Sequence, residues 1–169
     1  MATASCVTTW IACGKLRMDK PDAPHKDHLL TRRSSYTHWM KEQVRWSDTD
    51  MVGHVNNVAF AVFCETVRTH LMRPVFSGDS NPRAMVLLAR ITINFLGELH
   101  WPAIVEIGTG VLAVGRSSLH IGQGLFDGER CVGSAESVMV MIDEATRKSA
   151  ELPAWVRTYL SNFSIVEAS

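Results

Sequence analysis

The alternation of apolar and polar residues divides the chain into a polar start, one helix and several strands. Residues 1–35 are polar and show neither helical nor strand periodicity, so we expect a mobile N-terminal extension there. Residues 37–46 are extended in pattern and predict a first strand. A single domain is expected over residues 36–162, with residues 163–169 as a C-terminal tail.

One long helix is expected directly after a polar loop. Asn56 or Asn57 is suited to cap its start, and the helix should run to about Met72, with Pro74 ending it. Residues 58–64 are apolar around nearly the whole circumference of such a helix. We therefore expect the helix to be buried on most sides.

The rest of the chain is mostly strand-like. The segments with apolar residues at every second position are 90–95, 105–111, 117–126 and 129–142. A turn is expected at 97–102, and Asp127-Gly128 favours a tight hairpin turn between the last two strands. Pro153 suits the first turn of a short closing helix that reaches Leu160.

These elements predict an α+β fold. No other element could cover the apolar helix, so we expect an antiparallel sheet of about five strands to curl around it. No internal repeat or second domain is indicated.

Composition narrows the classes of partner. The 17 basic and 17 acidic residues give no net charge, which disfavours nucleic acid and anionic membrane surfaces and leaves small polyanions as ligands. No apolar run is long enough to span a bilayer, and no secretory signal is recognisable. The four cysteines form no CxxC pair, so we expect a reducing, cytoplasmic setting.

Chemically useful side chains are concentrated in residues 48–57. This loop holds two carboxylates, an imidazole and two amides just before the helix. Asp50 could act as base or nucleophile, and His54 could orient that carboxylate or carry a proton. The free N–H groups at Val55 to Val58 could receive an oxyanion. Alternatively, Asp48 and Asp50 only solvate the loop, and an asparagine only caps the helix.

Glu65 interrupts the apolar stripe of the helix. It lies one turn after Ala61 and beside Val62, where burial of a carboxylate is costly. Such a group either has a raised pKa or needs a partner, and both make it a candidate for acid–base work. The alternative is an ion pair with Arg68 or Arg90.

Three segments carry a resemblance to a known family. Residues 44–50, 53–57 and 63–68, which include the pattern DxDxxGHxNN, resemble the opening of hot-dog-fold thioesterases, with the hydroxybenzoyl-CoA thioesterase type as the most similar group. The likeness in pattern extends from about Thr37 to Tyr159. It implies the hot-dog fold and hydrolysis of acyl-CoA or acyl-carrier-protein thioesters to free acid and thiol.

The resemblance also implies roles for individual residues. Asp50 matches the catalytic carboxylate of the family and Asp48 a structural one. His54 matches a histidine of many members, Asn57 the point where a backbone N–H polarises the thioester carbonyl, and Glu65 an acidic position on the central helix. Plant acyl-carrier-protein thioesterases with a similar loop have an asparagine at the position of Val52, so a mechanism that needs that amide is excluded here.

Assembly and ligand contacts are implied as well. The family forms its active site between two subunits, so we expect a homodimer or a dimer of dimers. No cofactor and no metal is expected. The residues expected to contact substrate or CoA are Val55, Val58, Arg90, Arg116, Ser117 and Ser118.

The sequence disfavours several other kinds of site. The chain has no GxSxG motif for a serine hydrolase, and Cys64 lies on the apolar helix, where a packing role is favoured. His25 and His28 have an HxxH spacing but no third ligand nearby, which favours a solvated tail. Two rivals remain: a hot-dog dehydratase or hydratase, and a non-catalytic module that binds acyl thioesters.

Overall fold

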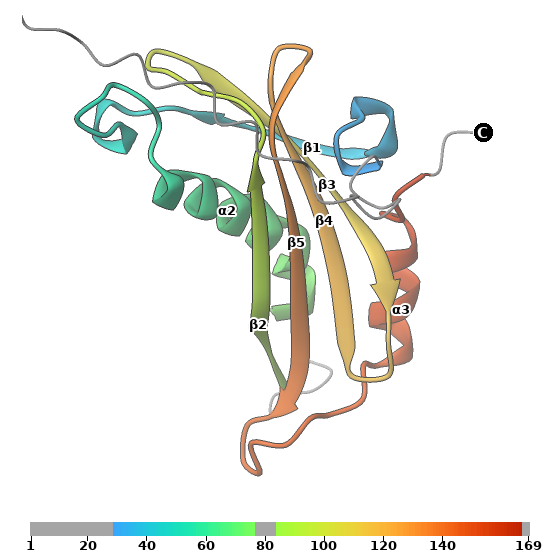
Figure 1. Cartoon of the computed structure of the whole chain (residues 1–169). Coiled ribbons are helices and arrows are strands. Elements are labelled where there is room, and N and C mark those ends of the chain that lie inside the picture. The colour runs from blue at the N-terminus through green and yellow to red at the C-terminus, as the bar shows by residue number, and fades with distance from the viewer. Residues whose placement is uncertain (1–28, 77–83, 167–169) are drawn as a thin grey trace, which may run out of the picture.

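The computed structural model describes residues 29–76 and 84–166 and contains one antiparallel sheet with a long helix against it (Figure 1). The elements follow the order η1 (Arg33–Ser35), β1 (His38–Gln43), η2 (Trp46–Asp48), α2 (Asn57–Phe76), β2 (Ala84–Phe95), β3 (Ile104–Val114), β4 (Ser118–Asp127), β5 (Arg130–Asp143) and α3 (Ala154–Ser161). The five strands lie in the order β1-β3-β4-β5-β2. The predicted α+β hot-dog architecture is confirmed.

The strand β2 lies at an edge of the sheet. It pairs with β5, from Ala84 opposite Asp143 to Phe95 opposite Gly133, and not with its neighbour in sequence, β3. The segment after β2 therefore crosses the sheet before β3 begins, whereas β4 and β5 form a simple hairpin. Gly128, with a φ of +59°, and Glu129 are the central residues of that hairpin turn, one position later than predicted.

The helix α2 is buried on one face only. Phe60, Phe63 and Val67 are buried against β-strand residues such as Ile107 and Leu125. The opposite face is open, with Val58 exposed by 69% and Val62 by 49%. The prediction of burial on most sides is wrong for this chain alone, because the sheet covers a single side of the helix.

Pro74 does not end α2. The helix continues to Phe76, two residues further. Proline has a helical φ, but it has no N–H to donate to the His70 carbonyl and its ring crowds that carbonyl, so the helix continues to Phe76 without that hydrogen bond.

Both ends of the described chain pack on the sheet face opposite α2. Leu30 is fully buried beside Tyr36 and Phe126, and the Tyr36 hydroxyl donates to the Leu30 carbonyl at 2.7 Å. The predicted mobile extension therefore does not hold for residues 29–35, because these apolar side chains fill a hollow in the sheet. Residues 1–28, with the HxxH spacing, lie outside the described residues.

The predicted C-terminal tail is also partly packed. The Val111 N–H donates to the Phe163 carbonyl at 2.7 Å, and the Ile165 N–H donates to the Val111 carbonyl at 3.0 Å. The Val166 N–H then reaches the Ser35 carbonyl at 3.2 Å, which joins the two ends. Residues 163–166 thus extend the fold, and residues 167–169 are outside the described part.

Glycines on the central strands make room for these ends. A Cβ at Gly108 would lie 2.5 Å from the Tyr36 ring, and one at Gly124 would lie 2.5 Å from the Leu30 carbonyl oxygen. Only a residue without a side chain permits this approach.

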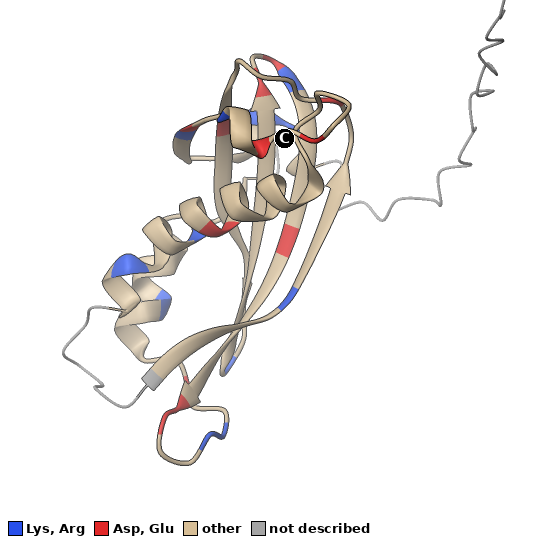
Figure 2. Cartoon of the chain, turned by 90° about the vertical axis from the view of Figure 1, so that its left-hand side faces the viewer, with Lys and Arg blue, Asp and Glu red and all other residues tan. Residues whose placement is uncertain are grey.

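The closing helix α3 follows Pro153 as predicted. Its own residues Val156 and Leu160 are buried. Within the described ranges, no helix is long and apolar enough to cross a membrane. In Figure 2 the positions of Lys and Arg and those of Asp and Glu are distributed over several helices and strands.

Candidate active site

The loop before α2 is closed by its own hydrogen bonds. Asp48 Oδ2 accepts the Arg45 N–H at 2.7 Å, and the Asp48 carbonyl accepts the Asn56 N–H at 2.9 Å. Thr49 and Val55 form a β-bridge across the loop. These contacts support the structural role expected of Asp48.

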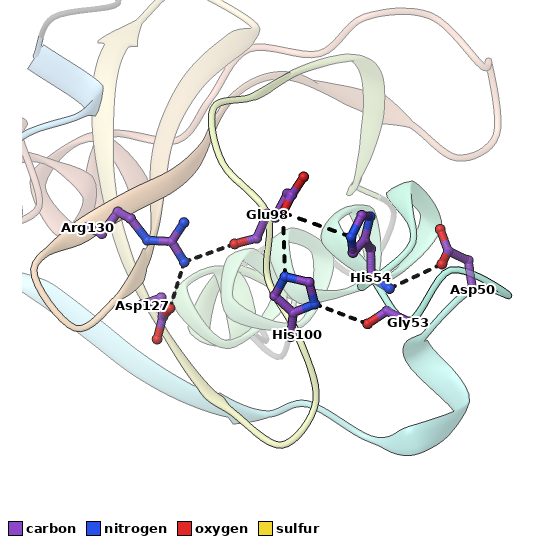
Figure 3. Close-up of polar contacts among 7 residues, drawn as sticks. All are labelled: Asp50, Gly53, His54, Glu98, His100, Asp127 and Arg130. Atoms are coloured by element: carbon purple, nitrogen blue, oxygen red, sulfur yellow. Dashed lines mark hydrogen bonds and ion pairs between the residues drawn. The ribbon is translucent and has the colours of Figure 1, made fainter. Parts of the chain in front are cut away.

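Asp50 lies at the tip of this loop with an exposed carboxylate. Its Oδ1 accepts the N–H group of Val52 at 2.8 Å and that of His54 at 3.1 Å, the second of which is drawn in Figure 3. Hydrogen bonds from the backbone, with that of Val52 the strongest influence, hold the pKa of this carboxyl below its usual value. The carboxylate is therefore ionised at neutral pH and able to accept a proton or attack a carbonyl carbon. Gly53 permits the tight turn with a φ of +86°.

The helix cap is Asn56. Its Oδ1 accepts the N–H groups of Val58 at 2.8 Å and of Ala59 at 3.1 Å, and α2 begins at the next residue, Asn57. Of the two asparagines that the sequence leaves open as caps, Asn57 is thus not used. The N–H of Val58 is bound to the cap and is not a donor for substrate.

Two further N–H groups at the helix start have partners as well. Val55 donates to the Leu99 carbonyl at 2.8 Å, and Asn56 donates to the Asp48 carbonyl. Among the residues that the structure describes, the Asn57 N–H is the one donor of the predicted four without a partner. The expected oxyanion site narrows to this single group.

A cavity of about 360 Å³ adjoins these groups. Its lining consists of Asp50, His54, Val55, Asn57, Phe60, Phe95, Leu96, Gly97, Glu98 and Leu99. It therefore brings together three of the four predicted catalytic residues beside an apolar wall.

Glu65, the fourth, lies elsewhere. It is exposed on the open face of α2, together with Val58 and Val62, and so is not the buried carboxylate predicted from the sequence. The buried charge on this helix is Arg68, which donates to Ser137 Oγ at 3.1 Å. Burial lowers the pKa of the Arg68 guanidinium.

The residues expected to contact CoA are not gathered at the cavity. Arg116, Ser117 and Ser118 lie at the β3–β4 hairpin, whereas the cavity adjoins the opposite end of β3. At about 3.4 Å per residue over β3, this separation is roughly 30 Å. Arg90 is exposed within β2 and does not line the cavity. Within one chain these four residues and Asp50 do not form a single site.

Sequence reasoning missed two residues beside the cavity. Glu98 Oε2 lies 3.9 Å from His54 Nε2 and 3.5 Å from His100 Nε2, and the two imidazole rings meet edge to face (Figure 3). The imidazole of His54 points to Glu98, while its backbone N–H contacts Asp50. The available signal was the Glu-x-His spacing within the segment predicted as a turn.

Known proteins are similar in sequence to most of this chain. Residues 44–160 match the model of the family described as the thioesterase-like superfamily. The uncharacterized protein YsmA of Bacillus subtilis is 29% identical over 126 residues, which cover 73% of this chain and 82% of that protein.

Solved structures share the fold. The PA5185 protein from Pseudomonas aeruginosa has a TM-score of 0.71 at 23% identity and covers 79% of this chain and 95% of its own. A thioesterase from Thermus thermophilus, solved with coenzyme A and Zn, has a TM-score of 0.67 at 23% identity and covers 76% of this chain and 95% of its own.

Proposed function

The chain belongs to the thioesterase-like superfamily, and from that membership we propose that it hydrolyses acyl thioesters to a free acid and a thiol. One observation carries the proposal. Asp50, with its ionised carboxylate, and Asn57, with its unpaired N–H, both line the same cavity, so a proton acceptor and an oxyanion donor are available to one bound carbonyl.

The proposed reaction has two steps. Water attacks the thioester carbon and gives its proton to Asp50, while the carbonyl oxygen, now negative, accepts the Asn57 N–H. The intermediate then expels the thiolate, which takes up a proton from His54 or from Glu65 of a second protomer, and the proton on Asp50 returns through solvent to that donor. In the alternative route, Asp50 itself attacks and the resulting anhydride is hydrolysed. If water attacks the Asp50 carbonyl carbon of that anhydride, one turnover in labelled water places ¹⁸O in Asp50, which the route with Asp50 as general base does not do.

We propose acyl-CoA as the substrate class, with acyl-carrier protein as the alternative carrier. The support is the structurally similar thioesterase solved with coenzyme A. The apolar residues Phe60, Phe95 and Leu96 of the cavity suit an acyl or aryl group.

The decisive experiment measures release of free thiol from a panel of acyl-CoAs. We expect hydrolysis of at least one member, and loss of roughly 10²- to 10⁴-fold in kcat for Asp50→Asn, as is usual when a general base is removed. Hydration of enoyl-CoA without thiol release would support the dehydratase reading, and tight binding without turnover the binding module. Either result would refute the proposal, as would a folded Asp50→Asn variant with wild-type turnover.

We further infer that the site is completed by a second copy of the chain. The edge strand β2 carries the exposed side chains of Leu87 and Leu88, and the open face of α2 carries Val58 and Val62. A partner that covers these surfaces would give Glu65 the buried setting that the single chain lacks. Homodimer and homotetramer both fit this expectation.

The phosphate contacts are also proposed to come from another protomer. Arg90, Arg116, Ser117 and Ser118 would then meet the phosphates of CoA bound at a neighbour's cavity. Arg116→Ala should raise KM for an acyl-CoA but not for the matching acyl-pantetheine, which lacks the nucleotide. Arg147→Ala, at another exposed arginine, serves as the control. An equal rise in KM for acyl-CoA and for acyl-pantetheine would show that Arg116 does not contact the phosphates.

We infer a cytoplasmic location from the cysteine pattern. The two cysteines in the described part, Cys64 and Cys131, are free thiols, in keeping with a reducing compartment. Fractionation of cells that express the chain tests this inference.

A further inference from the structure

Three side chains suited to bind a metal converge at the rim of the cavity. His54 comes from the loop before α2, and Glu98 and His100 come from the segment between β2 and β3. The three nearest ligand atoms lie within 4.8 Å of one another. In tetrahedral zinc sites, bonds of about 2.0–2.2 Å place ligand atoms roughly 3.3 Å apart. The two separations to Glu98 Oε2, 3.5 and 3.9 Å, are close to that value, and side-chain rotation must shorten the largest separation in the set, which is within 4.8 Å.

The backbone holds the two segments together. The Val55 N–H donates to the Leu99 carbonyl, and His54 and His100 form a β-bridge. Arg130 Nη2 donates to the Glu98 carbonyl oxygen at 2.9 Å (Figure 3). The backbone positions of the three residues are therefore fixed relative to one another, and their side chains need only rotate to reach a common ion.

The hydrogen bond between His100 and Gly53 indicates which ring nitrogen of His100 carries the proton. His100 Nδ1 lies 3.3 Å from the Gly53 carbonyl oxygen, which can only accept, so the contact requires a proton on Nδ1. In the neutral ring, Nε2 then carries a lone pair. It lies 3.5 Å from Glu98 Oε2, which is also an acceptor, so two acceptors face each other. Ligating histidines commonly donate their other N–H to a backbone carbonyl in this way.

We propose that His54, Glu98 and His100 bind a divalent transition-metal ion of the zinc type. Two imidazole nitrogens and one carboxylate oxygen suit zinc or its neighbours, whereas magnesium and calcium prefer ligand sets made of oxygen. A bound ion lies between the facing acceptors and clamps the loop of Asp50 to the β2–β3 segment. Because His54 and Glu98 line the cavity, the fourth coordination position of the ion is open to water or to a bound ligand.

No metal is expected from the sequence, because the ligands come from two segments that are more than forty residues apart in the chain. The proposed metal site shares His54 with the proposed hydrolysis, and when zinc occupies His54 Nε2 the proton for the thiolate comes from Glu65 of the second protomer. Zinc binding is measured without substrate. Zinc binding can therefore succeed or fail whatever the outcome of the hydrolysis assay.

The experiment titrates the full, chelator-treated chain with ZnCl₂ by calorimetry and measures bound zinc by elemental analysis. We expect one zinc ion per chain. His100→Asn and Glu98→Gln should each weaken binding by at least about tenfold, the smallest loss usual even for residues that only support a ligand. Cobalt(II) in place of zinc should give visible absorption bands of a nitrogen and oxygen site, and the same two variants should abolish them.

Matched variants exclude other sources of binding. His70→Asn and Glu129→Gln change an exposed histidine and an exposed carboxylate away from the three ligands and should leave the affinity unchanged. The pair His25→Asn and His28→Asn should also leave it unchanged. Equal affinity in His100→Asn, Glu98→Gln and the wild type would overturn the proposal, as would loss of binding in the His25 and His28 pair. Thermal unfolding of each variant checks that it is folded.

Discussion

At the scale of single residues, Asn57 allows the narrowest test of the proposed chemistry. It is the first residue of α2, where a backbone N–H has no helical partner and proline is well tolerated. Asn57→Pro should therefore keep the helix but remove the oxyanion donor. We expect kcat to fall roughly 10²- to 10³-fold, the usual loss for one such donor.

Asn57→Ala is the control for this change, since it removes the side chain and keeps the N–H. It should retain most activity, and thermal unfolding should show both variants folded. A folded Asn57→Pro variant as active as Asn57→Ala would show that this N–H does not hold the oxyanion.

Glu106 provides a prediction about pH. Its carboxylate accepts hydrogen bonds from Lys41 and Arg33, each at 2.9 Å, and these hold its pKa below the usual value, Lys41 most strongly. A lowered pKa means that the stabilisation is fully present above the unfolded pKa of about 4.3 and is lost as the pH falls through the folded value.

Glu106→Gln should therefore lower the free energy of unfolding near neutral pH by an amount on the order of 1 kcal/mol or less. The difference from wild type should shrink as the pH is lowered from neutral towards ~3, because the carboxyl takes up a proton in that direction. Urea unfolding at the two pH values measures it. A difference that stays constant with pH would rule out the ion pairs as its source.

At the scale of elements, local pattern predicted what depends on neighbours in sequence. Caps and turn residues predicted three elements: the helix start at Asn56 and Asn57, the β4–β5 hairpin, and the closing helix after Pro153. Long-range packing was not accessible in this way. The burial of Leu30, the exposure of Glu65 and the meeting of His54 with Glu98 and His100 depend on which surfaces the sheet covers.

The pairing of the N-terminal segment with the sheet can be tested at Gly124. A Cβ there would lie 2.5 Å from the Leu30 carbonyl oxygen and 2.9 Å from the Tyr36 hydroxyl, so backbone atoms must move. We expect Gly124→Ala to lower the free energy of unfolding by about 1–3 kcal/mol, as overpacking usually does.

Gly97→Ala is the matched control, because its Cβ would meet first the flexible end of Arg130, at 3.2 Å. It should change stability by less than about 0.5 kcal/mol. Urea unfolding compares the two, and equal stability would mean that residues 29–36 do not constrain the sheet.

At the scale of the whole molecule, the open edge of the sheet predicts association. Leu87 and Leu88 on β2 are exposed by 38% and 44%. If this edge forms an interface, glutamates in their place would have to be buried there, which is costly. The double variant Leu87→Glu/Leu88→Glu should therefore be monomeric and lose turnover, while the wild type should be at least a dimer of 18.8 kDa chains.

Light scattering after size-exclusion chromatography measures this. Val166→Glu, which charges another exposed apolar residue away from β2, should keep the wild-type mass and activity. An active wild-type monomer would contradict the shared site.

The packing of the chain ends has a practical consequence for anyone who expresses this protein. The family match covers residues 44–160, which omits β1 and both segments that rest on the central glycines. A fragment cut to those boundaries would leave Phe126 and its apolar neighbours open to water and invite precipitation. A shortened chain intended for crystallisation should therefore retain residues 29–166.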